Sequence, residues 1–211
     1  MMNDMVNKTL IIKKLLLFCF CCIMSTSINA QVKSKTYNDT LSAFQKKYIA
    51  THEVVKGKDR NYFRFFRIDN RYRVTCSFEK TVDSVGFAIK TSAGTEQQYF
   101  KYGKLSFSIR DTLLQLFVYQ SKDLMKTKEY RSYLFVPFTD ATTRDETYGG
   151  GRYLDLSVAE IVNGKLVLDF NKAYNPYCAY AKGFHCPIPP KENDLPLAIR
   201  AGEKSFGKAH G

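Results

Sequence analysis

Two stretches of this chain alternate strictly between apolar and polar side chains, and this alternation limits the fold more than any other feature. In residues 71–78 (RYRVTCSF), every second side chain is apolar or aromatic and the side chains between them are polar. Residues 104–110 (KLSFSIR) repeat the pattern. A period of two places one face against a core and the other in water, as in antiparallel sheets. The sequence therefore predicts an all-β fold that is mainly antiparallel.

Further runs of the same character predict more strands, at residues 62–68, 84–90, 97–102, 112–119 and 130–138. Turn-forming residues separate them, including Gly103 between two of the runs. Asn163-Gly164 lies between the apolar runs 158–162 and 165–170, and Asn-Gly in that position is a strong hairpin signal. Short strands at this regular spacing indicate a sandwich or a barrel.

Two segments depart from the β pattern. In residues 37–55, Leu41, Phe44, Tyr48 and Ile49 recur at near-helical spacing, which predicts one N-terminal amphipathic helix. Residues 171–196 contain five of the six prolines of the chain, so we expect an irregular but ordered C-terminal segment there.

The first thirty residues have the order of a secretory signal peptide. Lys8, Lys13 and Lys14 precede an apolar run at residues 15–24, and small and polar residues then lead to Ala30. The run is too short for the ~20 residues that span a bilayer. We expect cleavage near Ala30, an exported protein that is periplasmic or secreted, and no transmembrane segment in the mature chain. The expected organisation is a signal peptide at 1–30, a leader and helix at 31–61, and a single β-rich domain at 62–211.

The chain is strongly basic, with 32 Lys and Arg against 20 Asp and Glu and a formal net charge of +12. The cations are spread along the chain, which favours a soluble basic surface; attraction to anionic partners is the alternative. We identify no specific nucleic-acid motif, and the sequence predicts neither a cofactor nor an oligomeric state.

The last third of the chain carries more specific strings. They are ETYGGGRY (146–153), LDFN (168–171), AYNP (173–176), CAY (178–180) and AGEK (201–204). Together they resemble the domain of unknown function 1684 family of bacterial proteins, over roughly residues 62–204. The resemblance implies a shared fold core and a shared site, without a reaction. Many members of that family carry export signals, which agrees with the predicted signal peptide.

Gly149-Gly150-Gly151-Arg152 is a candidate anion site. The glycines allow the backbone to approach a ligand, and Arg152 offers a planar fork of donors to a carboxylate or phosphate. The string lacks the Gly-Lys-Ser/Thr ending of a P-loop. The alternative is a glycine bend where a strand enters the sheet, with Arg152 paired to an acidic neighbour. Under the first interpretation, Arg152→Ala abolishes ligand binding and leaves the melting temperature nearly unchanged.

We therefore consider three functions. The first is a β-domain that binds a small polar or anionic ligand, because tyrosine and asparagine are frequent in pockets for such ligands; the same residues also serve to fix the irregular segment onto the sheet. The second is a hydrolase with two carboxylates as acid and base, although carboxylates also balance arginine or cap loops. The third is a structural or interaction module of the cell envelope. The predicted ligand-binding residues are Tyr148, Gly150, Gly151, Arg152, Asn171, Tyr174, Asn175, Tyr180 and Asn193. The candidate catalytic carboxylates are Asp140, Glu146, Asp169 and Glu203.

Three of the six cysteines lie outside the predicted signal peptide: Cys178 and Cys186, which are close in the sequence, and Cys76. In an oxidising compartment, Cys178 and Cys186 are expected to form a disulfide. A metal site or a thiol nucleophile with His185 is the alternative, but the spacing matches no zinc signature, so no metal is predicted. Cys76 alternates with apolar residues in its strand and is expected to be a small core residue.

Overall fold

The structure is a computed structural model that describes residues 36–208. The predicted signal peptide, its cleavage site at Ala30 and most of the predicted leader lie outside the described residues. A helix covers residues 36–51 and so ends earlier than predicted. The chain divides into two compact units within this helix, between Phe44 and Gln45, and every site discussed below lies in the second unit. Within residues 36–208, no helix has the length and apolar character needed to cross a membrane.

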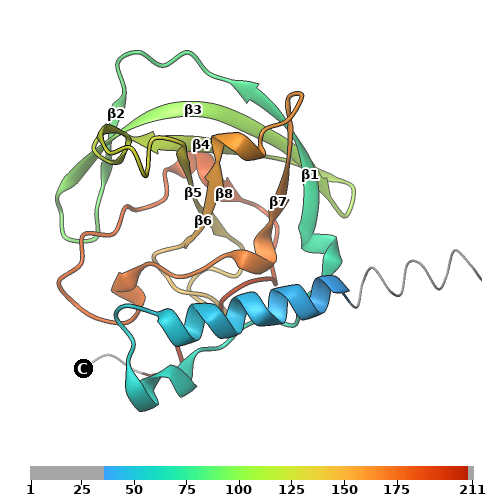
Figure 1. The fold of residues 1–211 in the computed structure, drawn as a ribbon, viewed down its shortest axis with the longest axis vertical. Coiled ribbons are helices and arrows are strands. Elements are labelled where there is room, and N and C mark those ends of the chain that lie inside the picture. The colour runs from blue at the N-terminus through green and yellow to red at the C-terminus, as the bar shows by residue number, and fades with distance from the viewer. Residues whose placement is uncertain (1–35, 209–211) are drawn as a thin grey trace, which may run out of the picture. The chain divides into compact units, whose positions relative to one another are not determined.

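Eight strands form one sheet that curls into a half-barrel (Figure 1). They are β1 (Arg73–Lys80), β2 (Phe87–Lys90), β3 (Glu96–Ile109), β4 (Thr112–Ser121), β5 (Tyr133–Asp140), β6 (Arg152–Ser157), β7 (Lys165–Asp169) and β8 (Asp194–Leu195). The order is β6-β5-β4-β3-β1-β7; β2 pairs with β3, and only β8, beside β5, runs parallel to its neighbour. The predicted class, mainly antiparallel β with one N-terminal helix, is confirmed.

Short 3-10 helices lie before β1 and between several of the later strands. They are η1 (Gly57–Tyr62), η2 (Asn70–Tyr72), η3 (Leu124–Lys126), η4 (Val158–Glu160), η5 (Phe170–Lys172), η6 (Tyr177–Ala179) and η7 (Lys191–Asn193). The proline-rich segment at 171–196 contains η6, η7 and the end of η5, and most of it is irregular as predicted.

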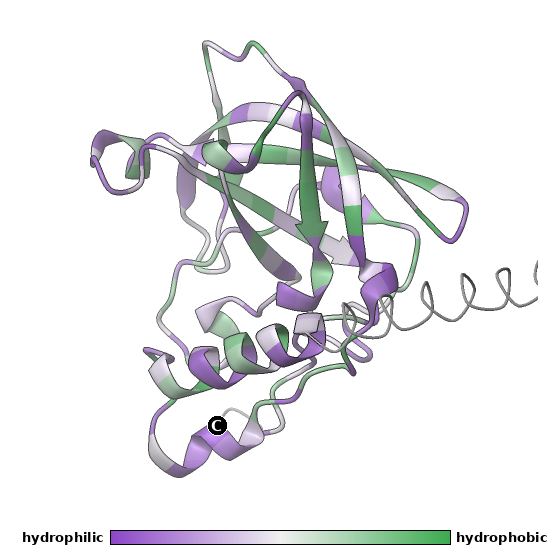
Figure 2. Ribbon diagram, turned by 45° about the vertical axis from the view of Figure 1, so that its right-hand side comes forward, coloured by the Kyte–Doolittle hydropathy of each residue, from purple (hydrophilic) through white to green (hydrophobic). Residues whose placement is uncertain are grey.

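The alternation along the strands separates the side chains onto two faces of the sheet, as the changing colours along the strands illustrate (Figure 2). The main core contains side chains such as Leu105, Leu116 and Leu134, none of which is exposed. Cys76 is buried among them, as predicted. The C-terminal segment contributes Ile199 and other residues to this core, so part of its apolar cover comes from irregular chain.

The other face of the sheet carries a layer rich in aromatic rings. Its buried members are Ile89, Tyr99, Tyr119, Phe135 and Tyr153, with Phe87, Phe117, Tyr133 and Tyr174 packed against them. Tyrosines supply apolar area together with a hydroxyl that needs a hydrogen-bond partner. The tyrosine hydroxyl groups therefore provide polar, hydrogen-bonding groups within this largely apolar layer.

Two predicted strand patterns were wrong. The run at 62–68 is not a strand, because its start belongs to η1 and only Phe65 forms an isolated bridge, with Glu203. The runs at 97–102 and 104–110 are one strand, β3, which continues through Gly103 with a shift of register there. A Cβ at Gly103 would overlap the ring of Phe78, so this glycine permits close packing inside a strand instead of a turn.

The predicted hairpin at Asn163-Gly164 is present only in part. Both residues have positive φ, 52° and 67°, as a type I′ turn requires. However, the run that precedes the turn forms η4 and a single bridge from Val162 to Lys165. The turn prediction is confirmed, and the predicted strand at 158–162 is not.

Candidate functional site

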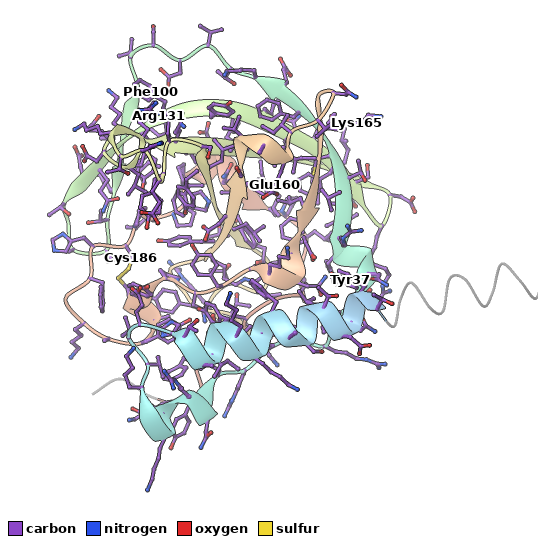
Figure 3. The ribbon with its side chains drawn as sticks, viewed as in Figure 1. Tyr37, Phe100, Arg131, Glu160, Lys165 and Cys186 are labelled. Atoms are coloured by element: carbon purple, nitrogen blue, oxygen red, sulfur yellow. A yellow bond between two sulfur atoms is a disulfide. The ribbon has the colours of Figure 1, made fainter. Side chains whose placement is uncertain are left out.

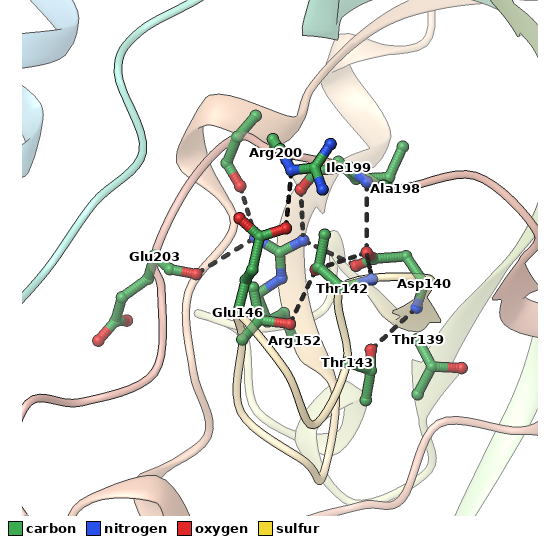
Figure 4. Close-up of polar contacts among 12 residues, drawn as sticks. Thr139, Asp140, Thr142, Thr143, Glu146, Arg152, Ala198, Ile199, Arg200 and Glu203 are labelled. Atoms are coloured by element: carbon green, nitrogen blue, oxygen red, sulfur yellow. Dashed lines mark hydrogen bonds and ion pairs between the residues drawn. The ribbon is translucent and has the colours of Figure 1, made fainter.

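Arg152 begins β6 and is 1% exposed. Its Nη2 donates to Asp140 Oδ2 at 2.7 Å and to the carbonyl oxygen of Ile199 at 2.9 Å. Its Nη1 donates to the carbonyl oxygens of Ala201 and Glu203. Figure 4 shows these contacts, with the Glu203 carboxylate directed away from the guanidinium. The string GGGR and the string AGEK therefore meet inside the protein.

Asp140 completes this connection from the end of β5. Its Oδ1 accepts hydrogen bonds from the Thr142 backbone at 2.7 Å, from the Thr142 hydroxyl at 2.6 Å and from the Ile199 N–H at 3.2 Å. Burial lowers the pKa of Arg152, and the charge of Asp140 opposes that effect. Buried carbonyl groups of irregular chain need partners, and Arg152 supplies them. These contacts favour the structural alternative for Arg152, a pair with an acidic neighbour.

The three glycines before Arg152 form the bend that this alternative requires. Gly151 has φ +83°, and a Cβ there would lie 2.6 Å from Pro189 Cγ and 2.7 Å from the Phe138 carbonyl oxygen. A Cβ at Gly150 would lie 2.5 Å from the Tyr148 ring. The glycines thus allow close approach of protein to protein at the entry to β6.

The side-chain amides of two predicted asparagines form hydrogen bonds with backbone N–H and carbonyl groups, as a neighbouring strand would. Asn193 accepts from the Phe117 N–H at 2.7 Å and donates to the carbonyl oxygens of Phe117 and Pro137, which joins β4 to β5. Asn171 accepts from the backbone of Asp69 at 3.0 Å and donates to its carbonyl oxygen at 2.9 Å. Both side chains are at most 1% exposed, so their polar groups serve the fold.

The carboxylate of Glu203 contacts the backbone of Asn175 in a buried cluster that also contains tyrosine hydroxyl groups. The Glu203 carboxylate accepts from the Asn175 N–H at 2.9 Å, from the Tyr180 hydroxyl at 2.7 Å and from the Tyr48 hydroxyl at 3.2 Å. Burial raises the pKa of Glu203 to about 7, although these donors favour its charged form. Glu203 is 0% exposed, so its carboxylate has no contact with solvent.

His52 lies against the same cluster. Its ring centroid is 4.6 Å from that of Tyr180, and its Nδ1 accepts from the Val55 N–H at 2.9 Å. The Nε2 is buried and has no hydrogen-bond partner. Burial lowers the pKa of His52 to about 4, so the imidazole is neutral over most of the working range of pH.

The four candidate catalytic carboxylates have different partners. Glu146 accepts from the exposed Arg200 at 2.7 Å, and Asp169 accepts from the backbone of Asn171 at 3.1 Å. Asp140 and Glu203 lie in the two buried networks described above. The balancing and capping roles given as their alternative account for the contacts of Asp140, Glu146 and Asp169.

Cys178 and Cys186 form the predicted disulfide, with their Cα atoms 6.3 Å apart (Figure 3). The Ser92 N–H donates to the Cys186 carbonyl oxygen at 2.9 Å, and the Ser92 hydroxyl accepts from the Cys186 N–H at 3.2 Å. The disulfide loop is therefore fastened to the turn between β2 and β3.

One polar site on the aromatic face was missed at the sequence level. Asp155, in β6, accepts hydrogen bonds from the hydroxyl groups of Tyr133 and Tyr174, both at 2.7 Å and both at Oδ1. No described residue donates to its Oδ2. Of the two tyrosines, only Tyr174 was among the predicted ligand-binding residues.

The surroundings of Asp155 are unusual for a surface carboxylate. The residue is exposed, yet desolvation by neighbouring protein atoms raises its pKa, against the opposing effect of the two phenol donors. Desolvation also raises the pKa of Tyr133 and Tyr174. Its partners Tyr133 and Tyr174 pack against the aromatic layer, so the carboxylate lies beside tyrosine rings at the edge of that layer. We call Asp155, Tyr133, Tyr153 and Tyr174 the Asp155 site.

A signal for this site was present in the sequence. Leu154 and Leu156 are buried in the main core, so the alternation of β6 turns Asp155 to the same face as Tyr153. The register opposite could not be read from the chain alone: β5 pairs Phe135 with Asp155, which brings Tyr133 within reach.

The fold and the site define a curled antiparallel β-domain that holds its own C-terminal segment through a buried Arg–Asp pair. The chain belongs to the family described as Protein of unknown function (DUF1684), whose model matches residues 60–204. It is similar to the solution NMR structure of the uncharacterized protein from gene locus rrnAC0354 of Haloarcula marismortui, with 29% identity and a TM-score of 0.61. The match covers 82% of this chain and 96% of that one. No curated protein matches the chain.

Proposed function

We propose that this protein is an exported β-domain that binds a small polar ligand at the Asp155 site. The observation that carries the proposal is the carboxylate of Asp155, which reaches solvent with one oxygen bonded to two tyrosines and the other without a protein partner among residues 36–208. Binding sites commonly combine aromatic walls with a few convergent polar groups.

The position of the charges favours a polar over an anionic ligand. The guanidinium of Arg152, which was the candidate anion receptor, already binds Asp140 and three carbonyl groups in the core. A carboxylate with an open oxygen repels an anion. We therefore propose that the ligand binds at Asp155 and that Arg152 stabilises the fold.

The hydrolase alternative has less support. Glu203 has a pKa suited to a general acid near neutral pH, but it is 0% exposed. A general acid must lie within hydrogen-bond reach of the substrate atom. We therefore place ligand binding before catalysis.

The export part of the proposal rests on the predicted signal peptide and gains support from the disulfide. Disulfides persist in oxidising compartments and are rare in the cytosol of most organisms. Mass spectrometry of the protein from the native cells tests this part. A mature chain that begins near Gln31 and is absent from the cytosolic fraction is expected, and a full-length cytosolic chain would contradict it.

Ligand-observed NMR tests the binding itself, with panels of sugars, polyols, amino acids and small amines. We expect at least one class to bind the wild type and to lose binding in Asp155→Ala. Glu160→Gln is the matched control, because it removes the charge of an exposed carboxylate that lies in η4 and is not one of the residues of the site. The proposal is wrong if no panel member binds, or if Asp155→Ala binds as the wild type does.

A further inference from the structure

The tyrosine protons on the aromatic face are already directed to protein acceptors. The hydroxyl of Tyr99 donates to Gln97 at 3.1 Å, and that of Tyr119 donates to Glu192 at 2.6 Å. The other hydroxyl groups, of Tyr133, Tyr153 and Tyr174, donate to Asp155 or to the Pro187 carbonyl oxygen. A phenol has one proton, so what these groups can still offer a ligand is acceptor capacity.

Asp155 adds the strongest acceptor at this place. Two phenol donors on Oδ1 favour the ionised form of the carboxylate, and an ionised carboxylate is an acceptor only. Its Oδ2 has no donor among the described residues. A ligand that satisfies this site must therefore bring hydrogen-bond donors.

The protein does not supply a cation to Asp155. The chain has 32 Lys and Arg against 20 Asp and Glu, yet no Lys or Arg within residues 36–208 forms a salt bridge with this carboxylate. Elsewhere on the same face, Glu192 is paired with Lys101 at 2.7 Å. An ionised carboxylate that has no cation among the described residues attracts a cationic ligand.

The rings around Asp155 also suit a cation. Tyr153 and Tyr174 meet at an interplanar angle of 89° with their centroids 5.9 Å apart, and Phe135 lies 4.7 Å from Tyr153. Tyr153 is buried in this contact, whereas Tyr133 and Tyr174 are only half-buried. The faces of aromatic rings attract ammonium groups, and these two half-buried rings belong to the same site as the open carboxylate oxygen.

We propose that the ligand of the Asp155 site carries a protonated amine, whose N–H groups donate to Asp155 Oδ2 while its alkyl part packs against the half-buried rings of Tyr133 and Tyr174. This inference rests on the proposed function and names its ligand class. A primary ammonium group fits best, because a quaternary group would bring charge without the donors that Oδ2 needs.

The test compares three probes of similar size by NMR titration of the full chain: propylammonium, 1-propanol and propionate. We expect propylammonium to bind at least about tenfold more tightly than 1-propanol, as a partly desolvated cation–aromatic and charge pair would give. Propionate should bind least. Asp155→Asn should abolish the preference for the amine, Tyr133→Phe should weaken amine binding while the ring remains, and Glu160→Gln should change nothing.

The outcomes separate the two proposals. If sugars or polyols bind at the Asp155 site and propylammonium binds no better than 1-propanol, the amine inference is wrong and the proposed function stands. If no probe and no panel compound binds, both are wrong. Should Asp155→Asn fail to fold, the order of the three probes on the wild type still decides.

Discussion

Arg152 is a charged side chain placed entirely inside the protein, and its contacts explain why the fold requires it there. Taking an ion pair out of water costs several kcal/mol for each charge, and the cost is recovered only when further hydrogen bonds satisfy both partners. Asp140 meets that condition through Thr142, and Arg152 meets it at both terminal nitrogens through carbonyl groups, while its buried Nε has no hydrogen-bond partner among the described residues. Removing one partner would leave the other charged, buried and unpaired.

Arg152→Met is therefore expected to lower the free energy of unfolding by about 3–5 kcal/mol, the range for breaking a buried pair. Urea denaturation measures this directly. Arg200→Met is the matched control, because its pair with Glu146 is at the surface and should be nearly neutral. If Arg152→Met keeps the stability of the wild type, the structural assignment of Arg152 is wrong.

At the scale of elements, the bend before β6 depends on one glycine more than on its neighbours. Only Gly151 of the three has a positive φ, and it also faces Pro189 and the carbonyl oxygen of Phe138. Gly149 is exposed, and a Cβ there would meet only Arg144 Cγ, at 3.2 Å. Gly151 is restricted by its backbone conformation and by packing, whereas Gly149 has only a flexible side chain beside it that can move.

Gly151→Ala should lower the free energy of unfolding by at least about 1–2 kcal/mol, the cost of a left-handed conformation for a residue with a Cβ. The overlap with Pro189 adds to this loss. Gly149→Ala should change stability by no more than a few tenths of a kcal/mol. Equal effects of the two substitutions, measured by urea denaturation, would contradict this account of the bend.

The elements also show what the sequence could and could not predict. Alternation found β1, β3, β4 and β5 because it records burial on one face of a strand, which is a local property. The sequence pattern divided β3 at Gly103, because a glycine that makes room for the Phe78 ring cannot be distinguished in the sequence from a glycine in a turn. Distinguishing the two requires the neighbouring strand.

The site was harder to predict for the same reason. Arg152 was identified as a special residue, but its partners lie at 140 and at 199–203, and only the folded chain brings them together. Asp155 was visible as a polar residue in an alternating strand. Its importance comes from Tyr133 and Tyr174, whose positions depend on pairing across β5 and β6. Local patterns specify strands, and contacts between distant segments specify sites.

For the molecule as a whole, two buried titratable groups oppose each other in the dependence of stability on pH. Glu203 has a pKa of about 7 in the folded protein, above its ordinary 4.5, so between these values the folded state holds a proton that the unfolded state has lost. Its contribution to stability is present below pH 4.5 and is lost as the pH rises through 7. His52 has a pKa of about 4, below its ordinary 6.5. Its contribution is present above pH 6.5 and is lost as the pH falls through 4.

We expect these two effects to cancel in part between about pH 4.5 and 6.5, and substitutions should reveal each one. With Glu203→Gln, the stability difference between wild type and variant should fall as the pH rises from 4.5 to 7, by up to about 3 kcal/mol. With His52→Asn, which retains an acceptor for the Val55 N–H, the difference should rise with pH over the range from 4 to 6.5. Urea denaturation at a series of pH values measures both, and taking differences removes the other titrating groups. Slopes of the same sign for the two variants would show that the two groups do not have the opposite burial effects assigned here.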